Sequence, residues 1–192
     1  MTLLIIGLAL FLGIHSVRIF LEPARLWAIN TFGAASWRAV YTLISVAGLV
    51  LIVLGYKPAA AAAEPVWVPP LGLQHVAATL LLLAFILVAA AYVPAGRIRA
   101  RLRHPMTIGV MIWAAAHLLI NGMEQEVVLF GSFLVWSILV YFGARRRDRQ
   151  MKLAYLAGPA RNDFVSIGIG TAVWLVFAFY VHEWLFGVAP FA

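Results

Sequence analysis

Six apolar runs, separated by short polar segments, make up most of this 192-residue chain. Most of them approach or exceed the roughly 20 residues that a helix needs to cross a bilayer. Only 11% of the residues are charged, compared with roughly 25% in soluble domains. Because a chain in lipid must satisfy its own backbone hydrogen bonds, the runs predict an all-α integral membrane protein, a six-transmembrane-helix bundle. The runs cover residues 2–21, 38–56, 71–92, 105–120, 126–142 and 164–186.

The segments between the runs are short. Residues 22–37 contain Trp27 and Phe32, and we expect them to lie at the membrane surface. We predict loops at 57–70 and 143–163. Neither loop is long enough to form a second domain. Residues 1–192 are therefore expected to form a single transmembrane domain. The first run lacks the preceding basic residues of a secretory signal, so we interpret it as a retained span.

The distribution of positive charge predicts the orientation. Thirteen of the 14 Lys and Arg residues lie in or beside the loops that follow the first, third and fifth runs, and Lys57 alone lies on the other side. Basic loops remain in the cytoplasm, which places both termini in the periplasm. The net charge of +7 is explained by this topology and by contact with the lipid bilayer, and it requires no nucleic acid partner.

Two of the five histidines are expected deep in the membrane. His15 lies roughly 9 Å, and His117 roughly 18 Å, from the cytoplasmic ends of their helices at 1.5 Å per residue. An ionisable group at this depth is costly and indicates a functional site. Two imidazoles on different helices are a usual way to hold haem between them. The alternative is that both histidines only form hydrogen bonds with neighbouring helices.

Three residues near these histidines are placed to contact a haem. Arg18, one turn from His15, is suited to pair with a propionate, or its side chain extends to the membrane surface. Trp113, one turn before His117, packs either on the macrocycle or in the core. His104 precedes Pro105 at the start of the fourth run, where it caps the helix, contacts a propionate or is solvated.

The remaining histidines have simpler interpretations. His75 and His182 lie near the outer ends of their runs, and we expect them to be interfacial anchors or partners of helix ends. His75 is the reserve iron ligand, because it lies at the level of His117.

Glu124 and Glu126 are expected to be solvated. A zinc site is disfavoured, because it needs three or four close ligands and the chain has no cysteine.

Four motifs in the sequence carry a family resemblance: G-I-His15-Ser16-V-Arg18, Trp37-Arg38-A-V-Tyr41, Arg103-His104-Pro105-M-x-x-G and Trp113-A-A-A-His117-L-L-x-Asn121-Gly122. Together they resemble the NnrU family, bacterial inner-membrane proteins linked to denitrification. The segments AYVPAGRIRARLRHP and RRRDRQMKLAYLAG resemble the same family, so the resemblance covers nearly the whole chain. It implies a multi-pass protein of the bacterial inner (cytoplasmic) membrane.

The NnrU family is distantly similar to 15-cis-zeta-carotene isomerase, an integral membrane haem b enzyme. The resemblance implies that His15 and His117 match its haem-ligand histidines and that His104 matches its His-Pro histidine. Ala114 stands where the isomerase has a cysteine that takes part in a ligand switch on the iron. The resemblance therefore implies a bis-histidine haem b without a thiolate ligand.

Three functional hypotheses follow from the resemblance. The first is a haem b-binding protein that supports nitrite and nitric oxide reduction, by electron or nitric oxide handling or by assembly of the reductase machinery. The alternative is an isomerase-like enzyme, a haem-dependent cis–trans isomerase of a lipid-soluble polyene such as a carotenoid. The third is a membrane assembly factor without haem.

Overall fold

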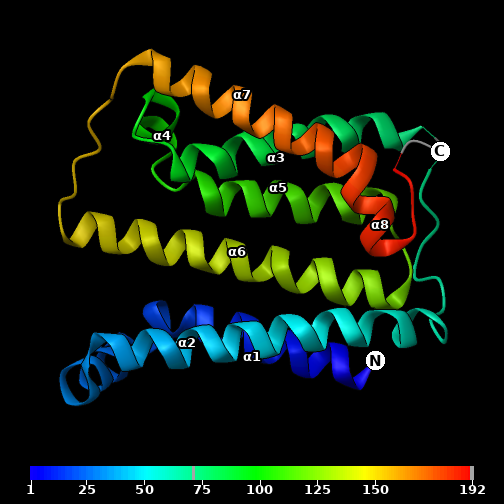
Figure 1. Cartoon of the computed structure of the whole chain (residues 1–192), viewed down its shortest axis with the longest axis horizontal. Helices are drawn as coiled ribbons and strands as arrows, with labels where there is room; N and C mark the ends of the chain where they lie inside the picture. The colour runs from blue at the N-terminus through cyan, green and yellow to red at the C-terminus, as the bar shows by residue number, and fades with distance from the viewer. Residues whose placement is uncertain (71, 191–192) are drawn as a thin grey trace. The chain divides into compact units, whose positions relative to one another are not determined.

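A computed structural model describes residues 1–70 and 72–190 (Figure 1). Leu71, the predicted first residue of the third span, lies outside the described residues. All regular elements of the described chain are helices, and Pro65 and Met123 form an isolated bridge. Its elements are α1 (Thr2–Phe20), α2 (Glu22–Ala60), α3 (Leu73–Tyr92), α4 (Arg97–Leu102), α5 (Pro105–Ile120), α6 (Glu124–Gln150), α7 (Ala160–Val176), the π-helical η1 (Phe177–Val181) and α8 (His182–Phe186).

The predicted helical membrane protein is confirmed. In the described chain five segments are long and apolar enough to span a bilayer: α1, α2, α3, α6 and the continuous stretch Ala160–Phe186. The fourth predicted span is α5, whose 16 residues reach only about 24 Å. Large apolar side chains point outward on the long helices, with Leu43 69% and Phe164 73% exposed. Six spans with both termini in the periplasm remain a prediction.

The described residues form two compact units. The first contains Met1–Val68 and Gly122–Trp136, and the second contains Pro69–Asn121 and the described chain from Ser137 onward. The first half of α6 therefore belongs to the first unit and its second half to the second. The two units are described separately below.

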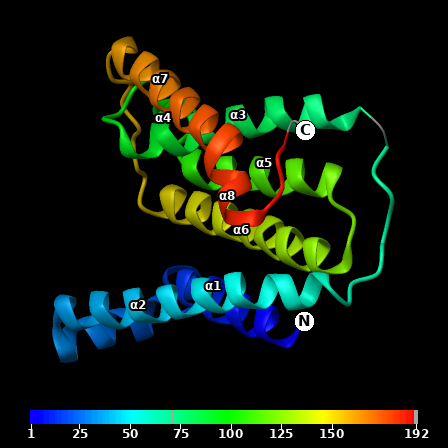
Figure 2. The same ribbon diagram turned by 45° about the vertical axis from the view of Figure 1, so that its right-hand side comes forward.

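Glycines bring α1 and α2 close together in the first unit, where the two helices run side by side (Figures 1 and 2). A Cβ atom on Gly48 would lie 2.7 Å from the backbone nitrogen of Phe11, and one on Gly7 would lie 2.6 Å from that of Ile52. Small residues are a usual means of close packing in lipid, where apolar burial between helices gains little. Leu4 and Leu8 of α1 are buried in the core of this unit.

Gly33 divides α2 into two parts. Its φ of +86° interrupts the helical backbone, a conformation that glycine adopts without steric cost. The part before Gly33 corresponds to the predicted surface segment, and the part after it contains the predicted second span. The helix then continues to Ala60, so the loop predicted at 57–70 begins four residues later.

In the second unit α3 contacts both α5 and α7. A Cβ atom on Gly109 of α5 would lie 2.9 Å from the Ala84 carbonyl oxygen, and one on Gly170 of α7 would lie 2.5 Å from the Cα of Ile86. Both helices thus approach the α3 backbone directly. After α8 the chain turns back toward α3 (Figure 2), because Gly187 adopts a left-handed φ of +72°.

One further sequence-based boundary needs correction, and one short helix was not predicted. Residues 143–150, predicted to begin a loop, continue α6 to Gln150. The arginine-rich segment that follows Gly96 forms α4, and its first turn is capped from α7. The Asp163 carboxylate accepts hydrogen bonds from the backbone N–H groups of Arg97 and Ile98, each at 3.0 Å.

Candidate functional site

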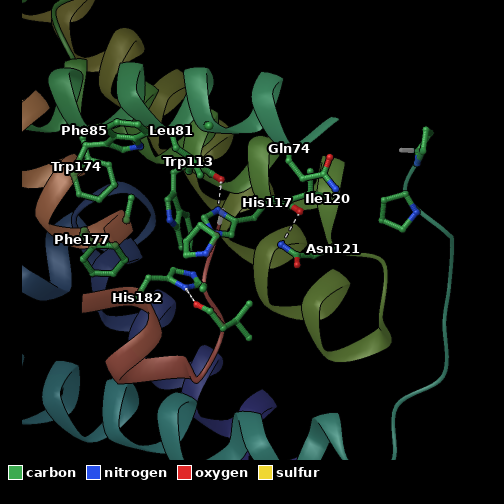
Figure 3. Close-up of a pocket in the computed structure, with 17 residues that line it drawn as sticks. Gln74, Leu81, Phe85, Trp113, His117, Ile120, Asn121, Trp174, Phe177 and His182 are labelled. Atoms are coloured by element: carbon green, nitrogen blue, oxygen red, sulfur yellow. Dashed lines mark hydrogen bonds between the residues drawn. The ribbon is translucent and has the colours of Figure 1, made fainter. Parts of the chain in front are cut away.

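The second unit contains a pocket of about 320 Å³ between α3, α5, the α7–η1–α8 stretch and the segment that follows α8 (Figure 3). Its walls are largely aromatic, formed by Phe85, Trp113, Trp174 and Phe177. The volume lies at the lower end of the range for small-molecule sites, which are typically apolar with a few polar groups. Here the polar groups that line the pocket are Gln74, His117, Asn121 and His182.

His117 lies on α5 and points into this pocket (Figure 3). Its Nδ1 lies 2.9 Å from the Trp113 carbonyl oxygen, one turn earlier on the same helix. A carbonyl only accepts, so Nδ1 carries the proton and the lone pair of the neutral ring lies on Nε2. A metal-binding histidine usually donates its other ring N–H to a carbonyl or carboxylate in this way. The two rings lie 5.0 Å apart, which places Trp113 beside His117 as predicted.

His182 points into the same pocket from α8 (Figure 3). Its Nδ1 donates to the Val188 carbonyl oxygen at 2.7 Å, so its lone pair also lies on Nε2. Sequence reasoning assigned His182 to the membrane interface and missed its place in the pocket. The only sequence signal was its predicted level in the membrane, which it shares with His117.

His15 belongs to the first unit, where aromatic rings surround it. The ring centroids of Phe11, Tyr41 and Trp136 lie 4.3, 5.1 and 6.2 Å from that of His15. Its Nδ1 bonds to the Phe11 carbonyl oxygen at 2.6 Å, which gives it the same tautomer as His117. The predicted pairing of His15 with His117 remains a prediction, and Arg18 is exposed at the end of α1.

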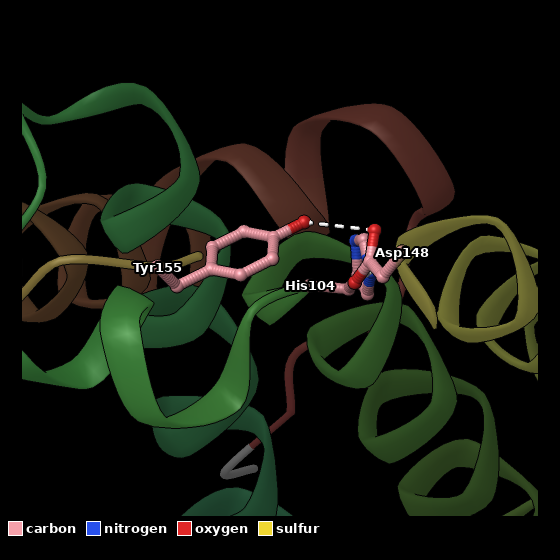
Figure 4. Close-up of polar contacts among 3 residues, drawn as sticks. All are labelled: His104, Asp148 and Tyr155. Carbon is pink, nitrogen blue, oxygen red and sulfur yellow. Dashed lines mark hydrogen bonds and ion pairs between the residues drawn. The ribbon is translucent and has the colours of Figure 1, made fainter. Parts of the chain in front are cut away.

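His104 lies in a second polar cluster, with Asp148 and Tyr155 (Figure 4). Its Nε2 is 2.8 Å from Oδ2 of Asp148, whose side chain is only 1% exposed. Tyr155 donates its hydroxyl to Oδ1 of the same carboxylate at 3.0 Å. His104 occupies the N-cap of α5 without forming a side-chain cap. The capping and solvated interpretations of His104 are therefore wrong, and a propionate contact remains a prediction.

This cluster lies beyond the apolar part of α6, and its environment affects two pKa values. Burial raises the pKa of Asp148, but hydrogen bonds from His104 and Tyr155 outweigh it, so the net pKa is below its usual value. Burial and the adjacent carboxylate both raise the pKa of the Tyr155 hydroxyl. The guanidinium carbon of Arg103 lies 5.6 Å from the centre of the Tyr155 ring, a cation–π distance that adds positive charge beside the carboxylate.

The remaining predicted residues lie elsewhere. His75, the reserve ligand, is exposed on α3 and does not line the pocket. Glu126 is not merely solvated, because it accepts hydrogen bonds from Met123 N at 3.0 Å and from the Tyr56 hydroxyl at 3.4 Å. Within residues 1–70 and 72–190, no group of three or more potential side-chain ligands is placed to hold a bare metal ion.

Comparison with known proteins gives a family match over almost the whole chain. The protein-family model described as "NnrU protein" matches residues 3–190. No curated protein and no solved structure matches the sequence significantly.

Proposed function

The chain belongs to the NnrU family, and on this premise we propose that it is a haem b protein of the bacterial inner membrane that supports denitrification. Its role would be to handle electrons or nitric oxide for nitrite and nitric oxide reduction, or to assist assembly of the reductase machinery. The observation that carries the proposal is His117, an imidazole directed into an aromatic pocket in a helix of the membrane domain.

The chemistry of the donor atoms fits haem. An axial imidazole must present a deprotonated nitrogen to the iron, and its other N–H usually donates to a carbonyl or carboxylate. His117 meets this condition through its bond to the Trp113 carbonyl, and His15 meets it through its bond to Phe11. Phe85, Trp113, Trp174 and Phe177 provide flat apolar surfaces of the kind that a porphyrin contacts.

Each residue has a defined part in this proposal. When bound, haem supplies a one-electron redox centre and an iron atom that binds small molecules such as nitric oxide. His117 would hold the iron, and the Trp113 carbonyl would fix the direction of the ring and increase its basicity. The aromatic walls would exclude water. The sequence resemblance names His15 as the second ligand and Arg18 as the propionate partner.

Purification from haem-supplied cells tests the proposal. We expect the detergent-solubilised protein to carry a Soret band and to give a b-type pyridine haemochrome spectrum. His117→Ala should lose most of the band, and His75→Ala should keep it, because His75 lies outside the pocket. A colourless wild-type preparation would overturn the haem proposal and favour a haem-free assembly factor.

A separate experiment tests the physiological role. We expect a strain that lacks the gene to grow poorly on nitrite under oxygen limitation, and the wild-type gene to restore growth. The His117→Ala gene should fail to do so at equal protein level. Normal growth of the deletion strain, despite haem in the purified protein, would refute the denitrification role while leaving the haem site intact.

A further inference from the structure

We propose that His182 is an iron ligand of the site that contains His117, so that the second unit alone supplies both axial imidazoles. The inference rests on the proposed haem function. Its first support is position: of the five histidines, only His117 and His182 line the pocket. They come from different helices and point into the same space (Figure 3).

The second support is the helix geometry that brings His182 into the pocket. In a regular α-helix the residue one turn before His182 is Ala178. The π turn η1 instead pairs the backbone N–H of His182 with the carbonyl of Phe177, five residues earlier. This places Phe177 and His182 on one face with ring centroids 6.0 Å apart, and both line the pocket. Single π turns in α-helices are frequent at functional sites.

His182 thereby repeats an arrangement found at the two predicted ligands. Phe11 stacks beside His15 and Trp113 beside His117, in both cases from four positions earlier. Phe177 stands five positions before His182, and the π turn makes this spacing equivalent to the other two. By contrast, His75 and His104 do not follow an aromatic residue at either spacing.

The third support is the tether of the His182 ring. The left-handed turn at Gly187 brings the Val188 carbonyl back to Nδ1 of His182, at 2.7 Å. The bond fixes the ring and leaves the lone pair on Nε2, the atom that binds iron. Val188 also lines the pocket, so the segment after α8 both closes the site and orients its histidine.

The ligand count favours haem iron over a bare ion. Zinc needs three or four protein ligands, whereas haem iron needs only the two axial ones because the porphyrin supplies four nitrogens. Along the described lining of the pocket there are two imidazoles and no Asp, Glu, Lys or Arg side chain. Two neutral ligands suit the ferrous porphyrin core, which has no net charge apart from its propionates.

The coordination state of the haem tests the inference. We expect the wild-type protein to be six-coordinate and low-spin by absorption and electron paramagnetic resonance. His182→Ala should lose most of the low-spin signal and become five-coordinate and high-spin, and added imidazole should restore low-spin character. His75→Ala should keep the wild-type spectrum, because His75 lies outside the pocket. Size-exclusion elution at the wild-type position shows that each variant is folded.

A methionine variant provides a positive signature that does not depend on loss of a signal. His182→Met places a thioether at the same position, and His–Met ligation raises the reduction potential of haem relative to bis-histidine ligation. We expect the potential to rise and the haem to remain low-spin. The inference is wrong if His182→Ala and His182→Met both keep the wild-type spectrum and potential, or if His15→Ala alone abolishes the low-spin signal. Wild-type protein without haem would instead refute the proposed function itself.

Discussion

Replacing His104 with alanine should strongly destabilise the second unit. The carboxylate of Asp148 is 1% exposed and is held by His104 at 2.8 Å and by Tyr155 at 3.0 Å. Removing the hydrogen-bonding partner of a buried carboxylate leaves its charge without compensation, at a typical cost of about 3–5 kcal/mol. Because the His104 side chain is 16% exposed, water will partly replace its hydrogen bond to Asp148. We therefore expect His104→Ala to lower the free energy of unfolding by about 3 kcal/mol.

The expected cost can be apportioned with a double-mutant cycle. Tyr155→Phe removes one hydrogen bond to a charged group and should cost about 1.5 kcal/mol. The double variant with His104→Ala and Asp148→Asn should be less destabilised than the sum of the single variants, because no carboxylate then remains buried. The expected coupling is about 2 kcal/mol, within the range measured for contacting groups.

The assay is equilibrium unfolding in mixed micelles titrated with sodium dodecyl sulfate and followed by tryptophan fluorescence. Arg149→Ala provides a matched control, because Arg149 is exposed one position from Asp148 and should change stability by less than about 0.5 kcal/mol. A cost below about 1 kcal/mol for His104→Ala, or additive effects of His104→Ala and Asp148→Asn, would refute the stabilising role of the His104–Asp148 contact.

Two further outcomes follow from the same structure and can be measured with the same unfolding assay. Because the pKa of Asp148 is lowered from its ordinary value of 3.8, this residue stabilises the fold at pH values above 3.8. Because the pKa of Tyr155 is raised from its ordinary value of 10.0, this residue stabilises the fold at pH values below 10.0. The free energy of unfolding should therefore fall as the pH drops below about 4 or rises above about 10. Asp148→Asn should weaken the fall at acid pH, and an unchanged fall in this variant would contradict the reasoning. Gly48→Leu should lower the free energy of unfolding by at least about 1–3 kcal/mol through overpacking, because the new Cβ would meet the backbone nitrogen of Phe11 at 2.7 Å. Gly13→Ala is the control: no atom lies within 4 Å of the new Cβ, so this variant should be neutral or stabilising.

The extent of α5 was predictable from local signals. The predicted run 105–120 coincides with the helix, because Pro105 favours a first helical position and the apolar residues end at Ile120. Its termination was less predictable. Asn121 is extended rather than left-handed, and the carbonyl of Gly122 accepts hydrogen bonds from Val66 and Trp67 at 2.8 and 3.3 Å. The helix end therefore depends on a segment more than 50 positions earlier in the sequence.

The extension of α6 and the presence of α4 have different physical causes. Arginine has a high helix propensity, so the charged residues after Phe142 do not end α6, although they end its apolar part. The short helix α4 depends on Asp163, which caps its first turn from 66 residues away. Composition distinguishes apolar from charged segments, but it does not show where such distant caps fall.

His15 and His117 were predicted as ligands from their depth in the membrane and from the family resemblance, whereas His182 lies near the outer end of its run. Both predicted ligands stand four residues after an aromatic ring, and a regular helix places residues at this spacing on one face. Phe177 and His182 stand five residues apart, which on a regular helix would direct them about 140° apart. The π turn removes that difference, and the tether from Val188 depends on the left-handed turn at Gly187. The pairing of each of the three histidines with an aromatic ring on its own helix therefore becomes visible only in the folded chain, and the spectrum of His182→Ala decides whether it has chemical meaning.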